Sequence, residues 1–262
     1  MIYFLSGWTN PGGSTEAHIK LVNTLNSYGY DACLCGKESY PLNKCKFQLV
    51  TSSFNIYKED SLVVHFKSNF THRLPVKNFI LSSHEQIVFP IKQINYKIFD
   101  KIHFVSDHQK VWHNINHPSF ICGNVIDDIK PSNTFGVVGI IGSIDRNKLT
   151  HISIKRALND GFKTILLFGL VTDPVYYDRF VKPFVDNKLA IYMGYCEDKQ
   201  KMYDMISDIY ISSDTETFSY IIIEGKKARK NIHTLPNKDY NNVNYELDNK
   251  KIVDIWIREL NL

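Results

Sequence analysis

The sequence has 262 residues, of which 44% are hydrophobic and 22% are charged. A chain of this length and composition buries a large core, and intrinsic disorder and collagen-like repetition are excluded. The 31 Lys and Arg residues and the 27 Asp and Glu residues give a net charge of +4. This mild basicity suits a protein that handles phosphates, but it does not by itself indicate a nucleic-acid binder. The sequence has no run of about 18 apolar residues, so no membrane span is predicted.

The first half of the sequence alternates short apolar runs with amphipathic stretches. Its start is apolar but short and carries no basic region, so we interpret residues 2–5 as a buried strand rather than as part of a signal peptide. Residues 14–28 are predicted to form a helix because their apolar side chains recur at helical spacing. Further strands are predicted at 32–35, 62–66, 79–82, 102–105 and 120–122, and a further helix at 107–114.

A polar segment at 127–134, which contains Pro131, ends this first half, and the pattern then restarts. Pro183 is expected to end or kink one of the helices of the second half. The predicted strands are 137–141, 164–168, 189–193 and 209–212, and the predicted helices are 151–159, 174–187, 199–206, 218–227 and 250–260. A polar loop is expected at 237–249.

The alternation of strands and helices predicts an α/β protein with doubly wound parallel sheets. Continuous apolar strands fit this class, because parallel sheets are covered on both faces. We expect two Rossmann-like domains, residues 1–130 and 131–249, and the helix at 250–262 is a candidate to pack back onto the first. Ligands of such sheets bind at the carboxyl ends of the strands, and in two domains those ends can face each other across a cleft.

The cysteines and histidines do not indicate a metal site. Five cysteines occur, and Cys33 and Cys35 are spaced too tightly for a usual zinc pair. We interpret all five as reduced thiols of a cytoplasmic protein. His113 and His117 have metal-like spacing, but they lack the Glu of H-E-x-x-H and Pro118 follows at once. No metal ligand is therefore predicted.

The first candidate site is the pair Gly12 and Gly13, between the first predicted strand and the first helix. Glycine lets the backbone approach a ligand closely, and a helix N-terminus is a natural seat for phosphate. The loop is neither a G-x-G-x-x-G fingerprint nor a Walker loop, which makes an NAD-dependent dehydrogenase a weak alternative. An ordinary turn with Ser14 as the N-cap explains the same residues equally well.

The second candidate site is the segment from Gly142 to Lys148, directly after the first strand of the second half. It contains Ser143 and two cations, Arg146 and Lys148, whose charges suit a diphosphate. Solvated Arg and Lys side chains are the commoner explanation when such a segment is taken alone.

The third candidate site is a pair of acids, Glu216 and Glu224, eight positions apart. Glu216 lies after a predicted strand, and Glu224 follows three isoleucines. A buried Glu is costly unless a partner satisfies it, and two sugar hydroxyls are such a partner because a carboxylate accepts several hydrogen bonds. The alternative is that Glu224 begins the solvent-exposed face that continues at Lys226 and Lys227.

Taken in order, these segments resemble the retaining GT-B glycosyltransferases of the large family-4 type over nearly the whole chain. The shared elements are a Gly-Gly loop, a strand ending in His, a strand ending in Ser, an Asn-containing turn, a Gly-Arg-x-x-x-x-Lys element and an E-x7-E motif. They correspond to Gly12–Gly13, Phe79–His84, Ile102–Ser106, Ile121–Asp127, Gly142–Lys148 and Glu216–Glu224, with Phe218 at the usual aromatic position.

The resemblance implies a GT-B fold and a metal-independent, retaining hexosyltransferase without a cofactor, whose donor substrate is a nucleoside-diphosphate sugar, with a UDP-hexose expected. It also implies that Lys148 and Arg146 neutralise the leaving diphosphate. Glu216 contacts the transferred sugar, Glu224 binds the ribose, and His84 lies near the sugar. The further donor-binding residues that it implies are Gly12, Gly13, Ser143, Phe218 and Ser219. The catalytic residues would be Glu216, His84 and Lys148.

This sequence departs from the family pattern at several positions, and two alternatives follow. Ser143 stands where the family usually has Arg, and Ser219 where it usually has Gly, so the protein is alternatively a catalytically degenerate GT-B fold that binds nucleotide or sugar. The basic segment 226–230 motivates the other alternative, a phage-type glucosyltransferase that acts on modified DNA bases. The sequence does not identify the hydroxyl acceptor, which is a glycan, a lipid-linked sugar, a protein or modified DNA.

Overall fold

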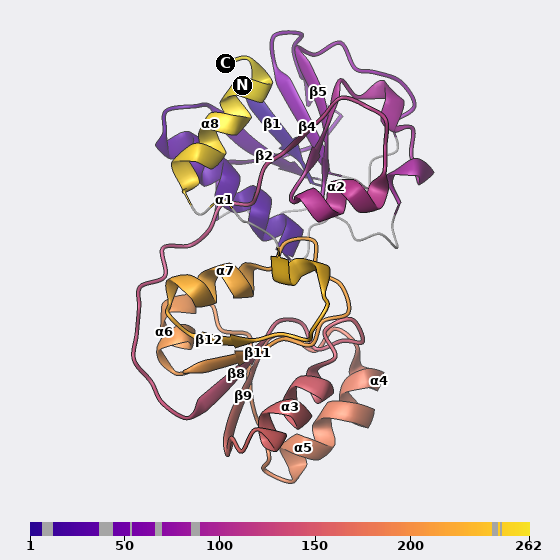
Figure 1. Cartoon of the computed structure of the whole chain (residues 1–262). Coiled ribbons are helices and arrows are strands. Elements are labelled where there is room, and N and C mark those ends of the chain that lie inside the picture. The colour runs from indigo at the N-terminus through magenta and orange to yellow at the C-terminus, as the bar shows by residue number, and fades with distance from the viewer. Residues whose placement is uncertain are drawn as a thin grey trace. The chain divides into compact units, whose positions relative to one another are not determined.

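The computed structural model describes residues 1–6, 13–36, 44–52, 54–65, 70–84, 90–242, 246 and 248–262, without the side chains of residues 239 and 242. The chain divides into two compact units (Figure 1). Unit 1 comprises Met1–Ile126 and Val243–Leu262, and unit 2 comprises Asp127–Asn242. Each unit is built on one parallel sheet, which confirms the predicted α/β class.

The sheet of unit 1 has seven strands in the order β3-β2-β1-β4-β5-β6-β7. The order in which the strands follow along the chain reverses between β1 and β4, which are paired neighbours near the centre of the sheet. The strands are β1 (Ile2–Leu5), β2 (Ala32–Gly36), β3 (Phe47–Leu49), β4 (Ser61–His65), β5 (Asn78–Ser83), β6 (Lys101–Phe104) and β7 (Ser119–Ile121).

Helices α1 (Gly13–Ser27) and α8 (Asn249–Leu260) pack against each other on one face of this sheet (Figure 1). Their apolar stripes and the strand residues beneath them form one continuous core. Trp256 of α8 is fully buried there, with its ring edge-on to those of Phe4 and Phe120 at centroid distances of 5.7 and 5.2 Å. A second core lies on the other face of the sheet, where α2 (Asp107–His113) contacts β6.

The sheet of unit 2 has five strands in the order β10-β9-β8-β11-β12, and its chain order reverses between β8 and β11. The strands are β8 (Val137–Ile141), β9 (Thr164–Phe168), β10 (Ile191–Gly194), β11 (Asp208–Tyr210) and β12 (Asn231–His233). Helices α6 (Lys199–Asp204) and α7 (Tyr220–Lys227) contribute to the core of one face. Helices α3 (Thr150–Asn159), α4 (Pro174–Tyr176) and α5 (Lys182–Asp186) contribute to that of the other, with a π-helical turn at Tyr177–Val181 between α4 and α5.

Pro183 does not end the helical stretch that begins at Pro174. The α-helix is instead interrupted just before Pro183 by the π-helical turn at Tyr177–Val181, and Pro183 lies in the first turn of α5, where the missing N–H costs little. Strands β3 and β12 were not predicted. Both are three-residue edge strands with mostly exposed or half-buried side chains, and so they carry no apolar run.

All five cysteines are free, with Cys33, Cys35 and Cys122 buried. Burial raises the pKa of the Cys122 thiol to about 12, as expected for a thiol that packs as a small apolar side chain.

Among the helices that the structure describes, none is long and apolar enough to cross a membrane.

Candidate functional site

The carboxyl ends of β8 and β11 border a small hollow that is partly open to solvent. It lies where the strand order of unit 2 reverses, which is the position at which doubly wound sheets bind ligands. Gly142, Ser143 and Lys148 line it from the loop after β8, and Ser212 and Ser213 line it from the segment after β11.

Two glycines shape the loop after β8. Gly142 has a φ of +131° and Gly169, which follows β9, has a φ of +145°, and side chains rarely adopt these conformations. A Cβ on Gly169 would lie 1.8 Å from the carbonyl oxygen of Gly142, so the two backbones are in direct contact. The amide of Gly142 also donates to the carbonyl of Phe168 at 2.9 Å. The loop therefore depends on the absence of a side chain at both glycines.

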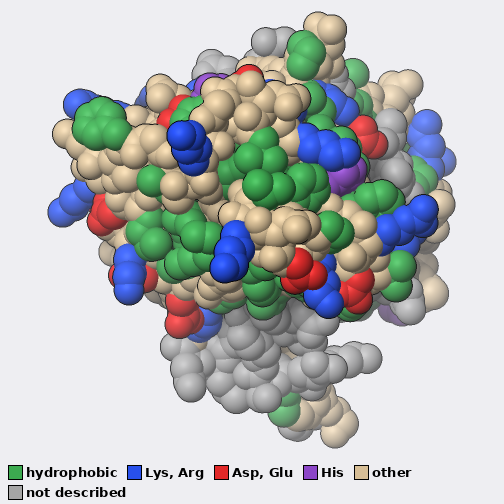
Figure 2. All heavy atoms as spheres, turned by 90° about the horizontal axis from the view of Figure 1, so that it is seen from below, with side chains coloured by type: hydrophobic (Ala, Val, Ile, Leu, Met, Phe, Trp, Pro, Cys, Tyr) green, Lys and Arg blue, Asp and Glu red, His purple; other side chains and the backbone are tan. Residues whose placement is uncertain are grey.

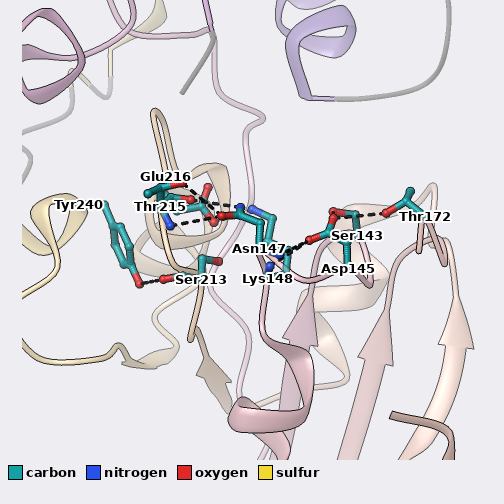
Figure 3. A network of polar contacts seen from close by, with 9 residues as sticks. All are labelled: Ser143, Asp145, Asn147, Lys148, Thr172, Ser213, Thr215, Glu216 and Tyr240. Carbon is teal, nitrogen blue, oxygen red and sulfur yellow. Dashed lines mark hydrogen bonds and ion pairs between the residues drawn. The ribbon is translucent and has the colours of Figure 1, made fainter. Parts of the chain in front are cut away.

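Asp145 holds the turn of this loop (Figure 3). Its Oδ1 accepts hydrogen bonds from the backbone amides of Asn147 and Lys148, both at 2.9 Å. Its Oδ2 accepts from the hydroxyls of Ser143 at 2.6 Å and Thr172 at 3.3 Å. Sequence reasoning did not single out Asp145, although an Asp that accepts from the backbone amide two residues further on is typical of an Asx turn.

An ion pair joins the loops after β8 and β11 (Figure 3). Lys148 Nζ lies 2.5 Å from Glu216 Oε1, and the two side chains are 23% and 9% exposed. Beside them, the side-chain amide of Asn147 donates through Nδ2 to the carbonyl of Thr215 at 3.3 Å. It accepts through Oδ1 from the Thr215 hydroxyl at 3.2 Å. Two of the predicted site residues, 68 positions apart in the sequence, are thus in direct contact.

Tyr240 supports the loop after β11 (Figure 3). Its hydroxyl donates to the Ser213 carbonyl at 2.8 Å. Burial, and then the charge of Glu216, raises the pKa of Tyr240 to about 12, so the phenol is neutral and remains a donor. Tyr240 lies 24 residues after Glu216 in a polar segment, and no sequence pattern pointed to it.

Glu224 lies on α7 and is 1% exposed, so it does not begin a solvent-exposed face. Its Oε1 lies 2.5 Å from Lys199 Nζ, and its Oε2 accepts from the Tyr203 hydroxyl at 3.2 Å. Lys199 also pairs with Asp127 at 3.0 Å. Burial lowers the pKa of Lys199, but the carboxylates of Glu224 and Asp127 outweigh it and raise the pKa overall. Sequence reasoning missed Lys199, because its partners lie 25 and 72 positions away along the chain.

The other predicted site residues of unit 2 described by the structure are Arg146, Phe218 and Ser219. Arg146 is 74% exposed and pairs through Nε with Asp173 at 2.9 Å. Phe218 is buried with its ring edge-on to that of Tyr220 at 5.1 Å. Ser219 is buried at the N-cap position of α7, and its hydroxyl does not cap the helix.

Unit 1 contains the remaining predicted residues. His84 follows β5 and lies beside His18 of α1, with a centroid distance of 4.8 Å between the rings. Burial, and then the neighbouring histidines, lowers the pKa of His84 well below its usual value. Gly13 is the first residue of α1, and Gly12 lies outside the described residues. Within the described chain, no three His, Cys, Asp or Glu side chains are grouped to hold a metal ion.

Solved structures share this fold. Anabaena HepE in complex with UDP-glucose is 12% identical and has a TM-score of 0.67 over 98% of this chain and 90% of that chain. TarM is 10% identical with a TM-score of 0.69, over 100% and 91%. AviGT4, a glycosyltransferase of avilamycin A biosynthesis, is 11% identical with a TM-score of 0.66, over 99% and 96%. No protein-family model and no curated protein matches the sequence.

These neighbours are GT-B glycosyltransferases, and at such low identity the likeness establishes the fold. The protein therefore has the GT-B fold, and the fold expected from the resemblance is confirmed.

Proposed function

We propose that the protein is a retaining glycosyltransferase that moves a hexose from a nucleoside-diphosphate sugar, a UDP-hexose, to a hydroxyl acceptor. The observation that carries the proposal is the ion pair between Lys148 and Glu216 beside the hollow at the strand reversal of unit 2. The fold supports it, because a protein of the same fold, Anabaena HepE, was solved with UDP-glucose. No metal ion and no cofactor is part of the proposed reaction.

The charges beside the hollow suit a leaving diphosphate. In the proposed reaction, Lys148 neutralises the charge that develops on the diphosphate oxygen, which is the largest contribution a site of this kind can make. Arg146 adds a second cation when its exposed side chain turns away from Asp173. Glu216 holds Lys148 in place and contacts the transferred sugar, and Glu224 binds the ribose hydroxyls.

The remaining residues of the proposal are Gly12, Gly13, Ser143, Phe218 and Ser219 at the donor, and His84 at the sugar. During transfer, the bond between the sugar C1 and the diphosphate oxygen breaks, and its electrons remain on that oxygen. The acceptor hydroxyl bonds to C1 from the same face, and its proton passes to the departing diphosphate. Retention of the anomeric configuration follows from this same-face attack.

Isothermal titration of the full chain with UDP, GDP and ADP tests the donor site. We expect UDP to bind, and we expect Glu224→Ala and Glu224→Gln to weaken it about 10- to 100-fold, as for the loss of a hydrogen bond to a charged group. Glu197→Ala is the control, because Glu197 is exposed. The absence of any nucleotide binding at millimolar concentration would contradict the proposal.

A second candidate is a nucleotide- or sugar-binding protein without transfer activity. The hydrogen bonds of Asp145 favour it, because they fix a carboxylate in the loop after β8. The two cations of that loop, Arg146 and Lys148, are each paired with an acid, so their charges are already neutralised. UDP release from UDP-glucose above the background rate, abolished in Glu216→Ala, would eliminate this candidate.

The described structure gives the DNA-modifying alternative no added support. Lys230, in the basic segment 226–230, is buried, and its ammonium donates to the carbonyl and hydroxyl of Ser132. On the face in Figure 2, Lys and Arg side chains lie among Asp, Glu and hydrophobic ones rather than in a single basic patch.

A further inference from the structure

Ser82, His18 and His103, which are buried, form a cluster in unit 1 with the half-buried His84, and the proposed transfer reaction explains only His84. The Ser82 hydroxyl oxygen lies 2.9 Å from His103 Nδ1, 3.3 Å from His84 Nε2 and 3.5 Å from His18 Nε2. Ser82 is fully buried, and His18 and His103 are each 2% exposed. A single hydroxyl is therefore shared by three imidazole rings.

The protonation of this cluster follows from one backbone contact. His103 Nε2 lies 2.7 Å from the carbonyl oxygen of Cys122, which can only accept, so Nε2 carries a proton. Burial lowers the pKa of His103 to about 4, so at neutral pH the ring has no second proton. Its Nδ1 is then an acceptor, and the one hydroxyl proton of Ser82 is donated to it.

The Ser82 oxygen can therefore only accept from the two other rings. His84 Nε2 and His18 Nε2 face its lone pairs, so both atoms must carry their ring's proton. Burial is the main cause that lowers the pKa of both rings well below the usual value, so both are neutral at pH 7. The Nδ1 atoms of His18 and His84 are then acceptors.

These rings line a small hollow, with room for about one water-sized group, together with Asn124 and Trp256. His18 Nδ1 is buried and makes no hydrogen bond within the described chain. A buried acceptor of this kind calls for a donor, and a neutral hydroxyl supplies one without placing a charge in the hollow. The described residues lining the hollow include no Lys or Arg to pair with an anion.

We propose that Ser82 and His103 are positioning residues that hold His18 and His84 as Nε2–H tautomers, and that the hollow these rings line takes a sugar hydroxyl rather than an anion. The assignment of the hydroxyl to a sugar rests on the proposed function. The hydroxyl belongs either to the hexose of the donor or to the acceptor. The tautomers themselves follow from the hydrogen bonds and do not depend on that function.

Two-bond ¹⁵N–¹H spectra of the histidine-labelled full chain at pH 7.5 test the tautomers. We expect Nε2–H for His18, His84 and His103 in the wild type. In Ser82→Ala, His103 keeps its tautomer because the Cys122 carbonyl remains, whereas His18 and His84 become mixed. Ser82→Thr, which retains a hydroxyl, restores the wild-type pattern, and Ser83→Ala is the control from the same strand. An Nδ1–H tautomer at His18 or His84 in the wild type overturns the proposal whether or not the variants fold.

The ligand class is tested by following the same resonances with free glucose, inorganic phosphate, UDP and UDP-glucose. We expect glucose or UDP-glucose to shift His18 and His84, and phosphate to leave them unchanged. A shift with UDP-glucose beyond that with UDP identifies the donor hexose, and a shift with glucose alone identifies the acceptor. Shifts with phosphate only, or with neither sugar, overturn the proposal for the hollow. If UDP and UDP-glucose fail to bind but glucose shifts both rings, the proposed donor fails and the hydroxyl site stands.

Discussion

At the scale of single residues, unit 2 pairs each of its two predicted acids with a lysine. Glu216 contacts Lys148 at the border of the hollow, and Glu224, which is 1% exposed, contacts Lys199, which is 33% exposed. A buried charge that loses its partner costs far more than an exposed one, and Glu224 is the more deeply buried of the two acids. We therefore expect unit 2 to depend for its folding mainly on the pair of Glu224 with Lys199.

Replacing Lys199 tests this dependence. We expect Lys199→Met to destabilise unit 2 by about 3 kcal/mol, because it leaves the Glu224 carboxylate buried without its cation. Lys199→Met combined with Glu224→Gln should recover part of the loss. Lys201→Met is the control, because Lys201 is exposed on the same helix. Denaturant unfolding followed by circular dichroism measures the effect, and a loss no larger than that of the control would show that Lys199 is not the required partner.

At the scale of elements, the loop after β8 is shaped by its contact with the residue that follows β9. Gly142 and Gly169 both have positive φ angles, and their backbones touch. Gly161 also has a positive φ, of +88°, but a Cβ there would meet nothing within 4 Å. A comparison of alanine variants at Gly161 and Gly169 therefore separates the cost of backbone strain from the cost of the steric clash with the loop.

We expect Gly161→Ala to cost about 1–2 kcal/mol through backbone strain. Gly169→Ala should cost about 1–3 kcal/mol more, because its Cβ forces the Gly142 carbonyl to move. The same variant should weaken UDP binding, whereas Gly161→Ala should leave it unchanged. Unfolding by denaturant and titration with UDP measure the two effects. Equal losses of stability in the two variants would contradict the account of the loop.

The sequence was informative about elements with continuous apolar runs. The central strands of both sheets, such as β1 and β8, were predicted because parallel strands are buried on both faces. The edge strands β3 and β12 were not, because a short, partly exposed strand has no apolar period to detect. The Asx turn at Asp145 is a local pattern, and the sequence alone was sufficient to predict it.

Contacts between residues that are far apart in the sequence could not be predicted from it. The acids and cations of the candidate site were named from motif spacing, but the partner of each was not. Lys199 approaches Glu224 only because α6 and α7 share one face of the sheet. The Ser82 cluster likewise needs the pairing of β5 with β6, which no local pattern specifies.

At the scale of the whole molecule, the two units can be followed separately. All three tryptophans, Trp8, Trp112 and Trp256, belong to unit 1, so tryptophan fluorescence reports on this unit alone. Unit 1 also holds the buried histidines, whose pKa values burial lowers. The pH dependence of stability is therefore expected to differ between the two units.

Unit 1 should lose stability as the pH falls from about 6.5 to about 4. His103 has a pKa of about 4 in the folded chain and near 6.5 when unfolded, so in this window the unfolded chain binds more protons. His103 alone contributes a loss of about 2 kcal/mol between pH 7 and 5. His18 and His84 shift in the same direction and add to it.

Urea unfolding followed by tryptophan fluorescence at pH 7 and pH 5 measures this loss. His72→Gln is the control, because His72 is exposed and should leave the pH dependence unchanged. Equal stability of unit 1 at the two pH values would contradict the burial of neutral histidines.

The rate of UDP release from UDP-glucose, with water or an added sugar as the acceptor, tests the role of Lys148 most directly. We expect turnover by the wild type, a loss of about 10²–10³-fold in Lys148→Met, as for the removal of one electrostatic stabiliser, and no change in Lys155→Met, whose lysine is exposed on α3. Equal rates in Lys148→Met and Lys155→Met, or no release by the wild type with any acceptor, would contradict the assignment of Lys148 to the departing diphosphate.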